Sequence, residues 1–494
     1  MSHGDDDMDD NAPGFSLAVS QNRYLSTEDD EMHAILTVTA QGVPGADVTA
    51  EVAEVIAIDC SGSMAYPPTK IAAAQRATKA AIDALRDGAL FAVIEGTHLA
   101  RVIYPTGPRL VAATPATRRA AKKAVSQLQA GGGTNMGEWL GLARGLLSDH
   151  PTAVRHVIML TDGQNSEADV RLDVELPACA RVFTCDARGI GADWEKRELL
   201  RIAAALHGTA DAVRQPADLV ADFEAMTKTA MGKVVPEVRV VVKTTTRSEV
   251  DFLRQTFPTE ARLVGDEVDA RTTAFGTGSW GAESREFHLR LKVDSSDAEP
   301  DTDIRVGRVD LEVRRAGATE FDRACPPAVV LVRWTDDMKK SSIMDPKVAH
   351  YTDQAELGQA VLRGCDAHDT GDLATAAAEW GRAVALATAL DNDKVLQRLL
   401  RLVDVVGEPA DGVVRLKDDL AAVDLLSVGM SSVMSSMSPE MPSAASPSPA
   451  ARATTGGTTG GATKAAPERT CPNCGKSWPA TARFCGDCRT AMTT

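Results

Sequence analysis

The stretch Val55-Ile56-Ala57-Ile58-Asp59-Cys60-Ser61-Gly62-Ser63 runs from an apolar segment directly into a polar turn. A short apolar run that ends at a turn is typical of a strand buried on both faces of a sheet. In open parallel sheets, ligands bind beyond the carboxyl ends of the strands. The turn therefore lies where binding chemistry is expected. Asp59, Ser61 and Ser63 occupy every second position of the turn, so one carboxylate and two hydroxyls can converge on a point.

The segment around this turn alternates apolar runs with helix-like stretches. Further apolar runs are Phe91–Ile94, Val102–Tyr104, Val157–Leu160 and Arg181–Cys185, and the helix-like stretches are Thr69–Arg86, Pro115–Gln129, Met136–Leu147, 194–206 and 217–231. Strands that alternate with helices, and that are apolar on both faces, predict a mainly parallel sheet covered on both sides. We expect an α/β domain of this kind over residues 51–232.

Two more turns in this segment carry oxygen side chains. Thr134 follows Gly131-Gly132-Gly133, and Asp162 ends the apolar run Val157–Leu160 in the sequence Leu-Thr-Asp-Gly. We expect both turns to meet the first one at the same edge of the sheet. All donors are then oxygen atoms, and Mg²⁺ is the metal that accepts few protein carboxylates in a near-octahedral shell.

The charge of this predicted site suggests how it works. Two aspartates and three neutral hydroxyls form a weak and unsaturated cage, so the metal would keep water and stay electrophilic. A carboxylate from another protein could displace a water molecule and complete the shell. The residues alone leave two alternatives open: these are ordinary turn residues, or the domain is intact but binds no metal.

With these motifs in this order, residues 50–232 resemble the von Willebrand factor A (VWA) family. The resemblance implies a Rossmann-like fold with a metal-ion-dependent adhesion site (MIDAS). It implies that Ser61, Ser63 and Thr134 touch the metal, and that Asp59 and Asp162 act mostly through water or by hydrogen bonding to the ligands. A partner Asp or Glu would fill the last position.

The rest of the chain is predicted to form two further folded parts. From Val234 onward, apolar and polar residues alternate with period two, as in His288–Val293 and Val309–Arg314. This alternation predicts an antiparallel β-sandwich over residues 233–336. The strands expected in residues 15–50 would join it. Residues 345–428 are rich in Ala and Leu at helical spacing and predict a small helical domain. A tetratricopeptide-type array is the alternative, but its usual three repeats are not found.

The C-terminal end contains a second candidate metal site. Residues 429–468 are mostly Ser, Pro, Thr, Gly and Ala, and predict a disordered linker. Residues 469–494 then carry two C-x-x-C motifs, formed by Cys471, Cys474, Cys485 and Cys488. Four thiolates at this spacing predict a closed, structural Zn²⁺ site, and the segment resembles a short zinc ribbon. Two disulfides are the alternative.

Composition limits the possible partners and compartments. The formal net charge is −16, so binding to nucleic acid is not expected outside a local basic patch. Residues 1–14 are predicted to be a disordered acidic tail. No apolar run is long enough to span a bilayer, and the start lacks the pattern of a secretory signal, so we expect a cytoplasmic protein with no membrane contact.

No motif of a known enzyme class is found. Gly131-Gly132-Gly133-Thr134 lacks the lysine of a phosphate-binding loop, and no G-x-S-x-G surrounds Ser61 or Ser63. Cys365 and His368 share helical spacing, but helix packing explains such a pair. We therefore predict that the chain is not an enzyme.

We instead predict a Mg²⁺-dependent scaffold that binds a partner protein's carboxylate. The flanking regions resemble intracellular bacterial VWA proteins, which implies a role in signalling or stress response, with kinases, phosphatases or phosphopeptide-binding proteins as partners. One alternative is a metal-presenting subunit of an ATPase or phosphoryl-transfer complex. Another is a regulator that contacts nucleic acid through the zinc ribbon.

Overall fold

The computed structural model describes residues 14–41, 50–165, 170–191 and 194–437, and the backbone of 468–470 and 477–479. The predicted acidic tail falls outside these residues except for Gly14. Most of the predicted linker and the four cysteines of the predicted zinc site also fall outside them. None of the described helices is long and apolar enough to cross a membrane.

A seven-stranded sheet forms the centre of the first domain, in the order β10-β9-β8-β4-β5-β6, with β7 also paired to β5. Strands β10, β9, β8, β4 and β5 run parallel, and β6 is antiparallel to β5. The strands are β4 (Val52–Asp59), β5 (Leu90–Gly96), β6 (Ala100–Tyr104), β7 (Val111–Ala112), β8 (Val154–Thr161), β9 (Thr184–Ile190) and β10 (Ala210–Val213).

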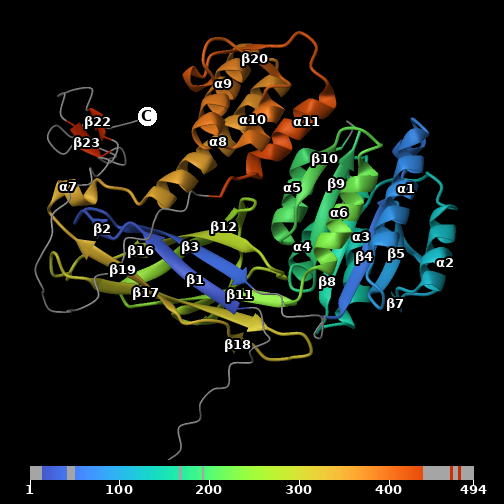
Figure 1. Cartoon of the computed structure of the whole chain (residues 1–494), viewed down its shortest axis with the longest axis horizontal. Helices are drawn as coiled ribbons and strands as arrows, with labels where there is room; N and C mark the ends of the chain where they lie inside the picture. The colour runs from blue at the N-terminus through green and yellow to red at the C-terminus, as the bar shows by residue number, and fades with distance from the viewer. Residues whose placement is uncertain are drawn as a thin grey trace, which may run out of the picture.

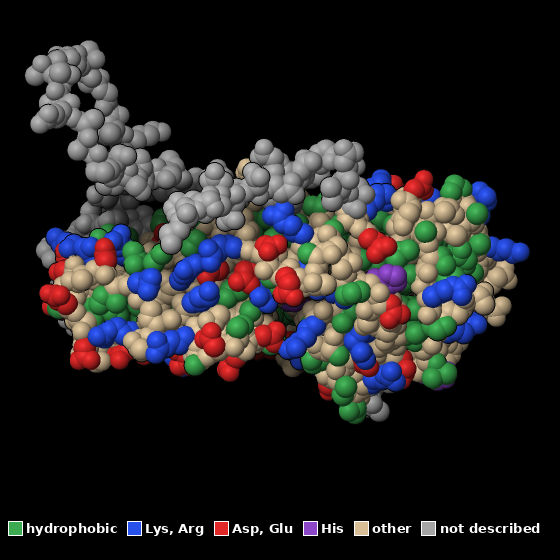
Figure 2. Space-filling model, turned by 90° about the horizontal axis from the view of Figure 1, so that it is seen from below, with side chains coloured by type: hydrophobic (Ala, Val, Ile, Leu, Met, Phe, Trp, Pro, Cys, Tyr) green, Lys and Arg blue, Asp and Glu red, His purple; other side chains and the backbone are tan. Residues whose placement is uncertain are grey.

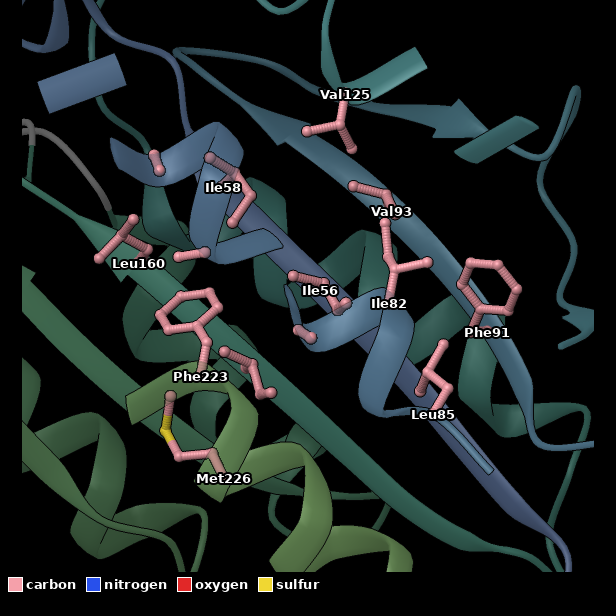
Figure 3. Packing of buried hydrophobic residues seen from close by; sticks show 14 of the residues in the cluster. Ile56, Ile58, Ile82, Leu85, Phe91, Val93, Val125, Leu160, Phe223 and Met226 are labelled. Atoms are coloured by element: carbon pink, nitrogen blue, oxygen red, sulfur yellow. The ribbon is translucent and has the colours of Figure 1, made fainter. Parts of the chain in front are cut away.

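Helices cover both faces of this sheet (Figure 1). Helices α1 (Thr69–Ala84), α2 (Pro115–Val125) and α6 (Leu219–Met231) pack on one face, and α3 (Met136–Ser148), α4 (Val170–Cys179) and α5 (Lys196–Ala205) pack on the other. Figure 3 shows Ile56 and Ile58 of β4 packed against Ile82 of α1 and Phe223 of α6. All eight residues of β4 are buried, as expected of a central parallel strand. This packing fixes the end of β4, where Asp59 lies.

Two mainly antiparallel sheets share a second core, and β2 is parallel to its neighbour β19. One has the order β1-β3-β16-β12-β13, and the other has the order β14-β15-β11-β17-β19-β2, with β18 paired to β17. The strands are β1 (Gly14–Gln21), β2 (Tyr24–Leu25), β3 (Glu31–Gln41), β11 (Glu237–Thr244), β12 (Ser248–Phe257), β13 (Ala261–Arg262), β14 (Gly265–Asp269), β15 (Thr272–Gly276), β16 (Ser284–Val293), β17 (Ile304–Arg314), β18 (Asp322–Arg323) and β19 (Ala328–Trp334). The N-terminal strand β3 pairs with β16, so the first domain is an insertion between strands of one unit.

The C-terminal part is mostly helical and contacts both other parts. Its elements are α7 (Met338–Ser341), α8 (Pro346–Asp369), α9 (Leu373–Ala389), α10 (Asp393–Leu399), β20 (Val403–Val405), the short helix η2 (Pro409–Asp411), β21 (Val414–Leu416), α11 (Ala422–Met430) and η3 (Ser431–Val433). Lys347 of α8 lies 2.7 Å from Glu286 of β16, and Arg398 lies 2.7 Å from Asp211 of β10. Near the C-terminus, β22 (Glu468–Thr470) pairs with β23 (Ser477–Pro479).

Three expectations from the sequence need correction. Residues 429–437, which the composition placed in the linker, are ordered: Met430 is buried, and Met434 forms a β-bridge with Thr259. Helix α4 was not expected. The strand expected at Arg181–Cys185 is β9, Thr184–Ile190, because the charged side chains of Asp186 and Arg188 interrupt its apolar pattern. Both charges are paired inside the protein.

Candidate metal centre

The polar turn that follows β4 is fixed by the carboxylate of Asp59. Asp59 is fully buried, and its Oδ1 accepts the backbone N–H of Ser61 at 2.7 Å. Its Oδ2 accepts the hydroxyl of Thr161 at 2.7 Å, from the end of the neighbouring strand β8. Burial raises the pKa of Asp59, and hydrogen bonds from Ser61 and Thr161 act to lower it. A buried carboxylate of this kind gains stability from a nearby cation.

The hydroxyls and the second carboxylate form one continuous chain. Ser61 Oγ lies 2.9 Å from Ser63 Oγ, and Ser63 Oγ donates to Asp162 Oδ1 at 2.7 Å. Ser61 and Asp162 are buried, whereas Ser63 is exposed. These contacts bring together the first and third predicted turns at one edge of the sheet.

Gly163 places Thr134 in the same cluster. A Cβ atom built on Gly163 would lie 3.1 Å from Thr134 Oγ1, 3.3 Å from Ser63 Oγ and 3.9 Å from Asp59 Oδ2. All five predicted residues therefore converge on one small space, which a larger residue at position 163 would crowd. The donors are two carboxylates and three hydroxyls, a set that fits Mg²⁺. Among the described residues, no cluster of three His, Cys, Asp or Glu side chains is found that could hold a metal instead.

Lys70 is a residue of this site that sequence reasoning missed. Its Nζ donates to Asp162 Oδ2 at 2.8 Å, and the two side chains are 8% and 0% exposed. Asp162 thus directs one oxygen to Ser63 and the other to Lys70. The sequence did contain a signal for this contact. Lys70 is in the first turn of α1, where the helix dipole disfavours a cation, and that turn has no acidic residue to offset the positive charge.

Asn165 links the second and third turns. Its Oδ1 accepts the backbone N–H of Met136, the first residue of α3, at 2.9 Å. Asn135 caps the same helix by accepting the N–H of Glu138. Asn165 thus holds the loop of Thr134 against the loop of Asp162, a tertiary contact for which the sequence gave no signal.

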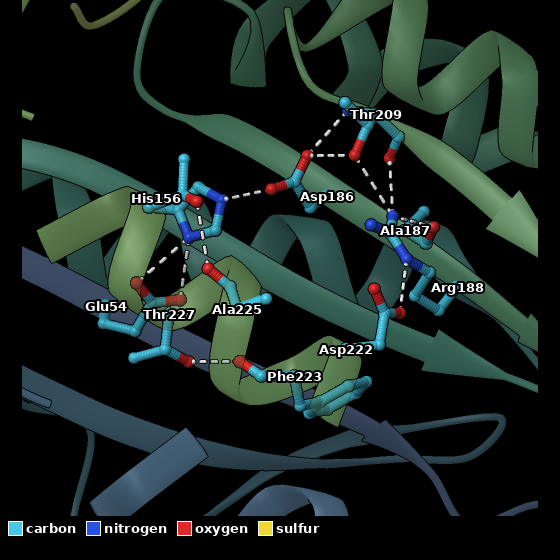
Figure 4. Close-up of polar contacts among 11 residues, drawn as sticks. Glu54, His156, Asp186, Ala187, Arg188, Thr209, Asp222, Phe223, Ala225 and Thr227 are labelled. Atoms are coloured by element: carbon cyan, nitrogen blue, oxygen red, sulfur yellow. Dashed lines mark hydrogen bonds and ion pairs between the residues drawn. The ribbon is translucent and has the colours of Figure 1, made fainter. Parts of the chain in front are cut away.

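A second buried polar cluster lies near the starts of the same strands (Figure 4). His156 Nδ1 is 2.9 Å from Glu54, and His156 Nε2 is 3.2 Å from Asp186. Burial acts to lower the pKa of His156, but the two carboxylates outweigh it and raise the pKa to about 10. Glu54 precedes Asp59 along β4 by about 16 Å, at 3.3 Å per residue, so this cluster is separate from the candidate metal site.

Comparisons with known proteins agree with this architecture. Residues 53–212 match the sequence pattern of the von Willebrand factor type A domain. A von Willebrand factor type A protein from Catenulispora acidiphila is 39% identical, with a TM-score of 0.79 over 87% of this chain and 99% of that one. The ArnB paralog VWA2 from Sulfolobus acidocaldarius is 14% identical with a TM-score of 0.51, covers 85% of this chain and 98% of its own, and is similar in fold alone. None of the curated proteins matches the sequence.

Proposed function

Because this chain belongs to the von Willebrand factor type A family, we propose that it is a Mg²⁺-dependent scaffold that holds a partner protein's carboxylate. Domains of this family are commonly interaction modules that carry a MIDAS. In our proposal, Ser61, Ser63 and Thr134 bind the metal directly, and Asp59 and Asp162 orient these hydroxyls or bind through water. The bound metal supplies an electrophilic position for one oxygen of the partner.

The observation that carries this proposal is the convergence of five oxygen side chains. Three of them surround Gly163, and Ser61 and Asp162 are hydrogen-bonded to one of these three, Ser63. Three of the five are neutral hydroxyls, and Lys70 shares the negative charge of Asp162, so the charge of a bound Mg²⁺ would be only partly balanced by the protein. Ser63 is exposed, so the cluster is accessible from solvent. A partly balanced, accessible cation recruits an anionic group from another molecule.

A non-catalytic role fits the thiols of the described residues. Burial raises the pKa of Cys60 and Cys185, of Cys179 to about 12, and of Cys365 to about 11. Thiols with raised pKa values stay protonated and are poor nucleophiles. The pair Cys365 and His368 noted in the sequence therefore supports helix packing rather than catalysis, since Cys365 belongs to the core of the helical part.

The partner class that we propose is protein rather than nucleic acid. Lys and Arg side chains are interspersed with Asp and Glu on the face seen in Figure 2, and the chain carries a net charge of −16. Nucleic acid binding depends on basic side chains that gather on one surface. We further propose that the partner belongs to bacterial signalling or stress response, as in the intracellular proteins that the flanking regions resemble, and that residues 469–494 form a zinc ribbon.

The test is affinity capture from native lysate with the wild type, Asp59→Ala and the control Asp149→Ala, each with Mg²⁺ and with chelator. Asp149 is exposed at the far end of α3, roughly 20 Å along the helix from Asn135. We expect partners that bind the wild type and the control with Mg²⁺, and that are lost with chelator or with Asp59→Ala. Isothermal titration should show Mg²⁺ binding weakened at least about tenfold by Asp59→Ala, which corresponds to the loss of one charged ligand. Partners indifferent to both changes would contradict the proposal.

A further inference from the structure

Four described segments of the loops around the candidate metal site lack charged side chains on their surface. The ranges 60–69, 96–99, 130–135 and 161–165, all of them described, contain one residue of the types Asp, Glu, Lys and Arg, and that residue is the buried Asp162. In the chain as a whole, 25% of the residues are of these types. A surface of this kind differs from the mixed charges of the rest of the molecule and is suited to burial in an interface.

Backbone hydrogen bonds join the first three of these segments, and the bond from the Met136 N–H to Asn165 Oδ1 joins the fourth; we call this continuous surface the metal face. Gly131 donates to the carbonyl of Cys60 at 2.7 Å, and Gly62 donates to the carbonyl of Gly132 at 2.9 Å. Asn135 donates to the carbonyl of Thr97 at 3.1 Å. The loops therefore form a fixed surface around the site, so a partner would meet a largely preformed shape.

Two large apolar side chains project from the metal face. Tyr66, which directly follows the short helix of Gly62–Ala65, is 83% exposed, and Leu99, in the loop after β5, is 62% exposed. A single exposed apolar residue needs no explanation. Two of them, on uncharged loops that also hold an electrophilic site, are typical of a surface that binds a protein.

Lys70 sets the charge of the site. Mg²⁺ carries two positive charges, which Asp59 and Asp162 together balance. Lys70 is buried 2.8 Å from Asp162, so these three side chains and a bound Mg²⁺ would together carry one positive charge in excess. One carboxylate from a partner makes the site neutral. A second acidic group would find no cation on the metal face, and would lose its hydration without compensation.

We propose that the metal face selects a protein segment with one Asp or Glu flanked by apolar side chains, which pack against Tyr66 and Leu99. This proposal rests on the proposed function, because the carboxylate must bind the metal. It names the chemistry of the partner: a lone acid in an apolar segment, as opposed to an acidic cluster or a phosphorylated segment.

The test uses the full chain with Mg²⁺ and four immobilised synthetic peptides. In the first, Leu and Phe flank a single Asp. In the second, two Glu residues flank the Asp, in the third phosphoserine replaces the Asp, and in the fourth Asn replaces it. We expect the first peptide to bind about tenfold more tightly than the second, the effect of burying roughly one apolar side chain. It should also bind more tightly than the third, because the second negative charge of the phosphoserine finds no cation on the metal face. The Asn peptide should not bind.

The double variant Tyr66→Ser, Leu99→Ser should abolish the preference for apolar flanks without changing Mg²⁺ affinity in isothermal titration. Equal or tighter binding of the Glu-flanked or phosphorylated peptide, or no peptide binding at millimolar concentration, would overturn the selectivity proposed here. If Mg²⁺ and Asp59 still governed binding of any partner, the proposed function would stand. Peptide binding that ignores both chelator and Asp59→Ala would overturn both proposals.

Discussion

Lys70 shows how one side chain can set the balance between metal and ligand. Its ammonium stabilises Asp162 in the metal-free protein, where the carboxylate would otherwise be a buried, unpaired charge. The same positive charge repels Mg²⁺ and attracts an anionic partner. The site should therefore bind its metal less tightly than its two carboxylates alone would allow.

We predict that Lys70→Met destabilises the metal-free protein by roughly 3–5 kcal/mol, the effect of removing one partner of a buried ion pair. Mg²⁺ should recover much of this loss, because it replaces the missing cation. The rise in melting temperature on adding Mg²⁺ should then be larger for Lys70→Met than for the wild type. Lys79→Met, on the same helix α1, is the control and should behave as the wild type. Equal Mg²⁺-induced rises in all three proteins would contradict this role for Lys70.

The sequence predicted the meeting of the three turns but not their supporting residues. Asp59, Thr134 and Asp162 each follow a strand or a glycine-rich turn, and strand ends of a parallel sheet share an edge, so their proximity could be deduced. Lys70 and Asn165 act through tertiary contacts with loops distant in sequence. Local spacing does not predict the partners in such contacts, although the uncompensated position of Lys70 in the first turn of α1 indicates that it needs an acidic one. Metal binding by these residues remains a prediction.

At the scale of single elements, the buried charged side chains of the central strands form ion pairs with one another. Glu54, His156 and Asp186 come from the neighbouring strands β4, β8 and β9. Glu54 is the register partner of His156, and Asp186 lies two residues beyond the partner of His156 on β9, so it points to the same face of the sheet. This is why β9 could not be located correctly from an apolar run. Helix α4 was missed although Leu172, Leu176 and Cys179 have helical spacing, since Pro177 interrupts the stretch.

The His156 cluster makes stability depend on pH. The folded pKa of His156 is about 10, above the ordinary value of 6.5, so its charge stabilises the fold fully below pH 6.5. This contribution is lost as the pH rises from 6.5 towards 10. We expect His156→Gln to lower the free energy of unfolding by roughly 3–5 kcal/mol at pH 6.

Urea unfolding of wild type and variant at several pH values measures this effect. The difference between them should shrink between pH 6.5 and 9.5, and His150→Gln, at the surface, should show no such trend. A difference that stays constant with pH would mean that His156 is neutral in the folded protein.

At the scale of the whole molecule, the helical part ties the metal-site domain to the antiparallel sheets. Arg398 pairs with Asp211 of β10, and Lys347 and Tyr351 contact Glu286 of β16. Period-two and helical patterns predicted these regions' elements, but composition misled at residues 429–437. There, Ser431 and Ser432 are buried. Ser431 donates its hydroxyl to the carbonyl of Val428, whereas the hydroxyl of Ser432 has no hydrogen-bond partner among the described residues.

The predicted zinc ribbon would add a second, metal-folded module to this scaffold. Four thiolates saturate a tetrahedral Zn²⁺, so we expect purified, reduced protein to contain about one zinc per chain by elemental analysis. The double variant Cys471→Ser, Cys488→Ser should lose it, because two thiolates cannot hold a structural zinc. Cys325→Ser, which removes a half-buried cysteine of the antiparallel sheets, is the control and should keep the zinc. Because the two metals would bind different parts of the chain, zinc loss should leave Mg²⁺ affinity at Asp59 unchanged. Zinc retained in the double variant, or disulfides among the four cysteines found by mass spectrometry, would instead show that this segment is not a zinc module.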